Sequence, residues 1–163
     1  MVPGRNDADG RFVVFDFDGT ILDGHSSVML VKSLLSQRIM PAHTVFSMAW
    51  WALRYKLSLP YGQNEVRQDI FSLFTDMTAV DVDKMIDRLY ETEISRFLRT
   101  DALESVRTYQ ELEVPVVIVS ASFEPIVKRA AENLGAYAQL STKMEVVDGR
   151  YTGKVGSTPC EGD

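Results

Sequence analysis

Apolar residues gather in two short runs, one near the start of the chain and one past its middle. The first run is Arg11–Phe15, followed by DFDGT at residues 16–20, and the second is Val114–Val119, followed by SAS at residues 120–122. A run that is apolar on both faces predicts a strand buried in a parallel sheet. Ligands bind at the carboxyl ends of such strands, so the polar residues after the two runs become candidate site residues.

Between these runs, from about Ser26 to Leu98, the apolar positions recur with helical spacing and no convincing strand interrupts them. Proline and glycine residues divide the segment, and Thr78 with Asp81 is typical of a helix start. The pattern predicts four amphipathic helices, which are Ser26–Gln37, Ala42–Leu57, Gln63–Phe74 and Thr78–Phe97. The segment is therefore predicted to be an all-helical insertion.

Helices and strands alternate after the insertion. The spacing predicts, in order, helices at Asp101–Leu112 and Glu124–Leu134, a strand at Tyr137–Leu140 and hairpin strands at Met144–Val147 and Tyr151–Val155. The hairpin turn is indicated by Asp148-Gly149, a strong two-residue turn signal. Gly135 suits the left-handed position after a helix. Strand, polar turn and helix thus occur twice, which favours the α/β fold class.

The composition is that of a folded globular protein. The chain has 163 residues, 45% of them hydrophobic and 25% charged, which suits one domain or a small domain with an insertion. With 17 Lys and Arg against 23 Asp and Glu, the net charge is −6, and no run rich in Lys or Arg offsets it. Nucleic-acid binding is therefore not expected.

We also expect no membrane span and no export signal. The N-terminus is polar, and the longest unbroken apolar run, Met48–Leu53, is far shorter than a span. The single cysteine, Cys160, cannot form a disulfide within the chain, which fits a reducing compartment. The expected location is the cytoplasm.

Asp16 and Asp18 are the strongest candidates for chemistry. They stand two residues apart directly after a predicted strand, so they point to the same side of an extended chain, and Gly19 lets the backbone turn beyond them. Such a pair can hold Mg²⁺, which prefers oxygen ligands. The alternative is a polar strand end without a ligand. A calcium loop is excluded because it requires Gly and Glu where this chain has Ile21 and Ser27.

Three segments together resemble the motifs of one family. FDFDGT at residues 15–20, VIVSAS at 117–122 and DGRYTG at 148–153 resemble the haloacid dehalogenase-like (HAD) superfamily, specifically its phosphoserine phosphatase-like branch. The first motif is highly specific where it follows an apolar strand, and the resemblance covers nearly the whole chain. It implies an α/β fold with a partial Rossmann-like parallel-sheet core, lacking its last strands, and an all-helical cap insertion. The core would comprise residues 1–23 and 100–163, and the cap residues 24–99.

The resemblance gives the two aspartates the roles of a phosphatase. Asp16 would attack phosphorus and become an aspartyl phosphate. Asp18 would protonate the leaving oxygen and then activate the water that hydrolyses the intermediate. The implied cofactor is Mg²⁺, bound by the Asp16 side chain and the Asp18 backbone carbonyl. The implied partner is a small phosphorylated substrate.

The same resemblance implies a set of residues that bind the phosphate group. Ser120 would donate a hydrogen bond to a phosphate oxygen, and Ala121 and Gly19 complete the set, helped by backbone N–H groups at the start of the next helix. The alternative for Ser120 is a helix cap, and the two roles can coexist.

The cap would close over the site, exclude water and select the substrate. His25 stands where phosphoserine phosphatases carry a Glu that recognises the substrate amine, which counts against phosphoserine. The alternative is an exposed histidine at a helix start. Arg54 would face phosphate, or would only extend from the apolar surface that Trp50 and Trp51 give the second cap helix. That surface is expected to be cap core, with a substrate pocket, a partner or a membrane surface as alternatives.

Two motifs of the family are not found before Asp163. The family carries a Lys after the hairpin and an acidic motif after a fourth strand, and Lys143 and Lys154 lie too early to serve. The sequence is therefore expected to be C-terminally incomplete and, as it stands, weak or inactive. Without a fourth strand, Arg11–Phe15 would form a bare sheet edge, which favours pairing with another chain. A homo-oligomer is thus among the expected states.

The resulting hypothesis is a Mg²⁺-dependent phosphomonoester hydrolase acting through an aspartyl phosphate on a small metabolite. One alternative is a non-catalytic or truncated interaction module that uses the aromatic cap helix. Another is a phosphotransferase or a dehalogenase on the same fold. The dehalogenase is less favoured because it uses no Mg²⁺ and usually lacks the second aspartate, present here as Asp18. Neither the substrate nor the oligomeric state follows from the sequence.

Overall fold

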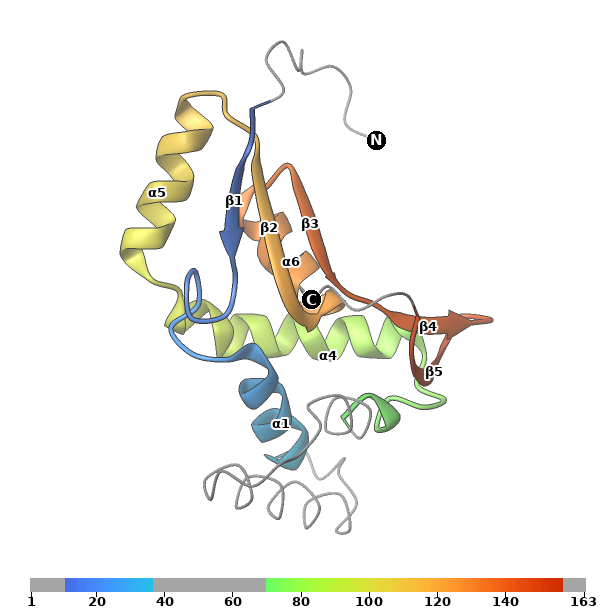
Figure 1. Cartoon of the computed structure of the whole chain (residues 1–163). Coiled ribbons are helices and arrows are strands. Elements are labelled where there is room, and N and C mark those ends of the chain that lie inside the picture. Colours follow the sequence, from blue (N-terminus) through green and yellow to red (C-terminus); the bar gives the residue numbers. More distant parts are fainter. Residues whose placement is uncertain (1–10, 37–69, 157–163) are drawn as a thin grey trace, which may run out of the picture.

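The computed structural model describes residues 11–36 and 70–156 (Figure 1). Three parallel strands form its central sheet in the order β1-β2-β3, namely β1 (Val13–Asp16), β2 (Val116–Phe123) and β3 (Ala138–Thr142). An antiparallel pair follows, β4 (Met144–Val147) and β5 (Arg150–Val155). The predicted α/β fold with a Rossmann-like parallel sheet is confirmed.

The helices lie between these strands in the predicted order. They are α1 (Ser26–Ser36), α4 (Ala79–Thr92), the 3₁₀ helix η1 (Ile94–Phe97), α5 (Thr100–Glu111) and α6 (Glu124–Leu134). The single helix predicted at Thr78–Phe97 is wrong, because Glu93 leaves helical geometry and the chain restarts as η1 with Ile94 fully buried. The predicted helix Ala42–Leu57 and most of Gln63–Phe74 lie outside the described residues.

Two helix ends follow from local chemistry. The Thr78 hydroxyl oxygen accepts the Asp81 N–H at 3.1 Å, and the hydroxyl donates to the Asp81 carboxylate at 2.7 Å, so the predicted start of α4 is confirmed. Helix α6 ends at Gly135, which takes the left-handed conformation with φ of 63°, as predicted.

One face of the parallel sheet is covered and the other is open within the described residues. On the covered face Ile118 is fully buried, and the ring of Phe15 meets Tyr109 of α5 edge-on with ring centroids 6.1 Å apart. On the other face Val14 is 50% exposed and Leu140 is 58% exposed. The prediction that the first apolar run is buried on both faces is therefore wrong here, because no described helix covers that side. Strand β1 lies at the sheet edge, as expected.

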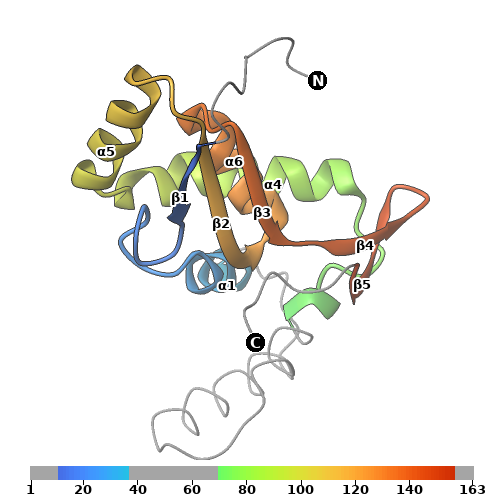
Figure 2. The same cartoon turned by 45° about the horizontal axis from the view of Figure 1, so that its top comes forward.

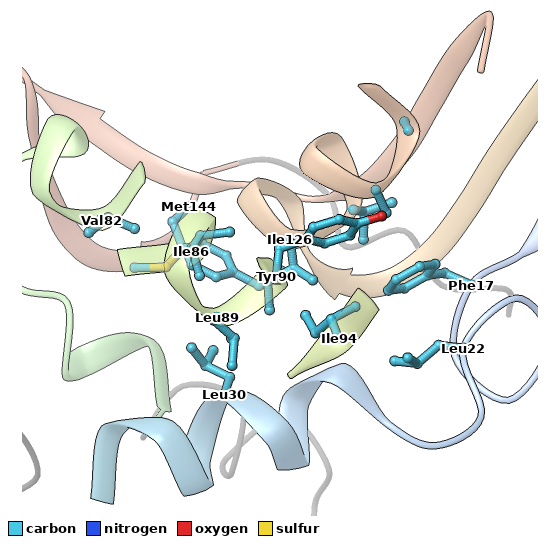
Figure 3. Packing of buried hydrophobic residues seen from close by; sticks show 14 of the residues in the cluster. Phe17, Leu22, Leu30, Val82, Ile86, Leu89, Tyr90, Ile94, Ile126 and Met144 are labelled. Atoms are coloured by element: carbon cyan, nitrogen blue, oxygen red, sulfur yellow. The ribbon is translucent and has the colours of Figure 1, made fainter. Parts of the chain in front are cut away.

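The hydrophobic core joins the inserted helices to the sheet. Helix α4 supplies one side of it. Figure 2 shows this helix running behind the strands of the sheet, and Figure 3 shows it packed between α1 and α6. The packed residues are Leu30 of α1, Val82, Ile86, Leu89 and Tyr90 of α4, Ile94 of η1 and Ile126 of α6. The described parts of the predicted cap and core thus share one continuous hydrophobic cluster, and the boundary at residues 99 and 100 stays a prediction.

The predicted hairpin is confirmed. Asp148 and Gly149 both have positive φ, 50° and 75°, as a type I′ turn requires. The hairpin is tied to the segment before α4, since Asp76 N–H donates to the Tyr151 carbonyl at 2.9 Å and Tyr151 N–H donates to the Met77 carbonyl at 3.0 Å. The Tyr151 ring is thereby held within the core.

This buried phenol predicts a loss of stability at high pH. Burial raises the pKa of Tyr151 from 10.0 to about 12, and the negative charges of Asp83 and Glu124 add to the shift. As the pH rises, Tyr151 therefore loses its proton in the unfolded chain before it does so in the folded protein. The contribution of the buried phenol to the free energy of unfolding is complete below pH 10 and is lost as the pH rises towards 12.

We expect the free energy of unfolding to fall between about pH 9 and pH 11 by about 1 kcal/mol more in the wild type than in Tyr151→Phe. Urea unfolding of the two proteins at both pH values measures this difference. Equal losses in both proteins would contradict the assignment, because every other titrating group is common to them.

Candidate active site

The chain leaves the sheet for the inserted helices and returns from them at one place. Asp23 N–H donates to the Phe97 carbonyl at 2.7 Å, and Arg99 N–H donates to the Ile21 carbonyl at 2.9 Å. Leu22 also bridges to Leu98 in antiparallel fashion. These bonds fix the loop that follows β1 and bring the start of α1 close to the carboxyl end of the sheet.

Asp16 is the last residue of β1, and its side chain is exposed at the carboxyl end of that strand. It pairs with Val119 of β2 in the sheet register, and its Oδ1 accepts the N–H of Phe17 at 2.8 Å. The ring of Phe17 is fully buried and anchors the loop from within. Asp16 therefore presents an exposed carboxylate from a fixed backbone position.

Gly19 turns the loop between the two aspartates and α1. Its φ of +80° lies in the left-handed region, and no atom lies within 4 Å of the place a Cβ would take. Conformation, not space, therefore selects glycine here. Its N–H donates to the carbonyls of Leu22 at 2.9 Å and Gly24 at 3.0 Å, so it serves the turn in this structure.

Asp18 is partly buried and surrounded by hydrogen-bond donors. Its Oδ1 accepts the backbone N–H of Ser26 at 2.6 Å. Its Oδ2 faces three hydroxyl groups, those of Ser26 at 3.2 Å, of Ser120 at 3.4 Å and of Ser122. The second carboxylate is thus held by the first inserted helix and by the central strand.

Two of these serines belong to β2, which extends further than predicted. The strand was expected to end at Val119, but it runs to Phe123, and its register with β3 shifts between those two residues. Ser120 is therefore a strand residue, and its alternative role as a cap of α6 is wrong, because α6 begins only after Phe123. Side chains two residues apart on a strand point to one side, which brings Ser120 and Ser122 to Asp18 together.

The other predicted site residues are placed as follows. The carbonyl of Ala121 accepts the hydroxyl of the buried Thr142 at 2.8 Å, which fixes the backbone between the two serines. His25 precedes α1 and is exposed, and its carbonyl accepts the Met29 N–H at 3.2 Å. Arg54 lies outside the described residues, as does the aromatic surface of Trp50 and Trp51.

The sequence gives no individual role to Ser26 or Ser122, although Ser122 lies within the motif at residues 117–122. A signal for Ser122 was present, because Ser120 and Ser122 have the two-residue period of a strand. A strand predicted to end at Val119 places both serines in a turn, where this period does not apply. No local pattern marks Ser26, whose side chain is fully buried.

The donor chemistry of the two aspartates fits Mg²⁺. No cluster of three or more His, Cys, Asp or Glu side chains is found in residues 11–36 and 70–156. The oxygen donors here are the exposed Asp16 carboxylate and the backbone carbonyl of Asp18, since both side-chain oxygens of Asp18 accept hydrogen bonds. A hard cation that keeps several waters can use so few protein ligands, whereas zinc prefers four ligands from nitrogen and sulfur.

Among the helices that the structure describes, none has the length and apolar character that crossing a membrane requires.

Sequence comparison relates the chain to a hydrolase family. The sequence model of the haloacid dehalogenase-like hydrolases matches residues 13–163. A probable phosphatase of Mycobacterium tuberculosis (strain ATCC 25618 / H37Rv) is 26% identical over 143 residues, which cover 86% of this chain and 50% of the relative. The chain therefore spans about half the length of the curated relatives it matches.

Solved structures share the fold. A protein with unknown function from Bordetella pertussis Tohama I superposes with a TM-score of 0.80 at 22% identity, covering 92% of this chain and 68% of that one. A probable phosphoserine phosphatase from Vibrio cholerae in unliganded form gives a TM-score of 0.63 at 17% identity, covering 91% of this chain and 41% of that one. At these identities the likeness establishes the fold alone.

Proposed function

Because the chain belongs to the haloacid dehalogenase-like hydrolase family, we propose that the whole protein is a Mg²⁺-dependent phosphomonoester hydrolase acting through an aspartyl phosphate. One observation carries the proposal. An exposed carboxylate ends the edge strand, and a second carboxylate, two residues later, is held by hydroxyl and amide donors. A nucleophile that is open to substrate beside a fixed acid and base is what this reaction requires.

In the proposed first step Asp16 forms a bond from its carboxylate oxygen to phosphorus, and the ester bond from phosphorus to the leaving oxygen breaks. Asp18 donates its proton to that oxygen, so the product leaves as an alcohol. In the second step a water molecule attacks the phosphorus, and Asp18 takes the proton from it. The bond from Asp16 to phosphorus then breaks, and inorganic phosphate is released with the carboxylate restored.

The remaining groups hold the phosphate and the cation. Ser120 would turn its hydroxyl from Asp18 towards a phosphate oxygen, beside the backbone at Ala121 and Gly19. The Asp16 carboxylate and the Asp18 carbonyl would hold Mg²⁺. When bound, this cation offsets the repulsion between the carboxylate and the phosphate.

The choice of substrate is assigned to the helical segment, residues 24–99, acting as a cap. His25 lies directly before α1, the first helix of this segment, and is exposed, so its imidazole can reach a bound substrate. Arg54 is proposed as a second specificity residue. The substrate class is a small phosphorylated metabolite, and the proposed location is the cytoplasm.

The test uses the protein expressed from its complete gene. We expect Mg²⁺-dependent hydrolysis of p-nitrophenyl phosphate, abolished by EDTA and restored by added Mg²⁺. Acid quenching during turnover should yield protein heavier by one phosphoryl group, with the modified peptide containing Asp16. Hydrolysis that persists in EDTA, or turnover without a phosphorylated protein at any time point, would refute the proposal.

A further inference from the structure

The hydroxyl groups around Asp18 form an ordered chain. The Ser26 hydroxyl lies 2.8 Å from the Ser122 oxygen and 3.2 Å from Asp18 Oδ2. A hydroxyl has one proton to donate. The Ser122 hydroxyl can therefore donate a hydrogen bond to Asp18 while its oxygen accepts one from the Ser26 hydroxyl. Each of the two serines then has a partner for its proton. The direction of the chain runs from Ser26 through Ser122 to the carboxylate.

Ser120 and Ser122 of β2 make different hydrogen bonds. The Ser120 oxygen accepts the backbone N–H of Ser122 at 3.1 Å. The hydroxyl of Ser120 also donates to Asp18 Oδ2, and at 3.4 Å this is the longest of the three hydroxyl contacts to that oxygen. Under the proposed function this hydroxyl turns to the phosphate. The Ser122 hydroxyl then remains as the donor from β2 to Asp18 Oδ2.

The other oxygen of Asp18 is held by a different element. Ser26 is the first residue of α1, and N–H groups in the first turn of a helix have no partner within that helix. Asp18 Oδ1 accepts this N–H, so a side chain eight residues earlier in the chain caps the N-terminus of α1. Both oxygens of Asp18 are thus fixed, one by α1 and the other by β2.

We propose that Ser122, supported by Ser26, is a positioning residue that sets the orientation of the Asp18 carboxyl group; this inference rests on the proposed function. Ser122 touches neither the nucleophile nor the phosphate in this assignment. Its hydroxyl prevents rotation about the bond between Cβ and Cγ of Asp18. A carboxyl free to rotate would meet the leaving oxygen and the attacking water less often.

The test compares variants that differ in the hydroxyl. Ser122→Val and Ser122→Thr have nearly the same shape, and Thr keeps the donor; Ser122→Ala removes it with the least change. We expect Ala and Val to lower kcat about tenfold, the scale of one lost hydrogen bond to a charged group, with KM little changed. Thr should restore most of the rate. Ser105→Ala, which removes an exposed hydroxyl on α5, serves as the control.

Hydrogen exchange of the Ser26 amide supplies a measurement that needs no catalysis. In the phosphate-free protein this N–H should be protected by Asp18, and protection should fall about tenfold in Ala and Val but not in Thr. Unchanged protection and unchanged kcat in Ser122→Val would overturn the positioning role. A wild type without phosphatase activity would refute the proposed function instead, while the exchange data would still decide whether Ser122 orients Asp18.

Discussion

Asp16→Asn should lower kcat for p-nitrophenyl phosphate by roughly a thousandfold or more, the scale seen when a covalent nucleophile is removed. The amide cannot attack phosphorus as a carboxylate does, so no phosphorylated protein should form. The fold should persist, because the side chain is exposed and Asn keeps an oxygen to accept the Phe17 N–H. Steady-state kinetics and intact mass after acid quenching measure the two effects.

Two further variants make this result specific. Asp23→Asn removes another exposed carboxylate of the same loop and should leave kcat near the wild-type value. Asp18→Asn should behave differently from Asp16→Asn, because p-nitrophenolate leaves readily without a proton donor, whereas the second step still requires a base. The phosphorylated protein should therefore accumulate in Asp18→Asn. Comparable activity in Asp16→Asn and the wild type would exclude Asp16 as the nucleophile.

The features that could be predicted from the sequence are set by neighbouring residues. The Asp148-Gly149 turn requires positive φ at two successive positions, and few residue pairs other than this one supply it. The start of α4 depends on Thr78 and Asp81, which are one helical turn apart. The placement of Asp16 at a strand end likewise follows from the apolar run directly before it.

The features that could not be predicted depend on residues far apart in the chain. Strand β2 continues to Phe123 because its end pairs with Thr142 of β3. The strand propensity of the residues near Phe123 carries no information about this distant partner. The serines around Asp18 are 8, 102 and 104 residues away from it, so no spacing rule joins them. The open face of the sheet depends on which elements pack against it, and not on the apolar run itself.

The end of β2 also bears on stability, because Phe123 joins three parts of the fold. Its ring is 4% exposed, and its centroid lies 5.5 Å from that of Phe71, 5.1 Å from that of Phe74 and 6.0 Å from that of Tyr151. These rings come from the segment before α4 and from the hairpin. The side chain therefore connects the sheet to two elements that make no strand pairing with it.

Phe123→Ala should reduce the free energy of unfolding by about 3 to 5 kcal/mol. The loss combines the transfer of a buried ring to water with the cavity left among three other rings, which the strand on one side and the hairpin on the other keep from collapsing. The free energy of unfolding of a domain is only about 5 to 15 kcal/mol. Urea unfolding should therefore show a much lower midpoint concentration of urea, while the dependence of the free energy on urea concentration changes little. Phe12→Ala removes a ring that is 63% exposed and should cost about 1 kcal/mol or less. A loss at Phe123 no larger than that at Phe12 would mean that the aromatic cluster does not hold the hairpin and the sheet together.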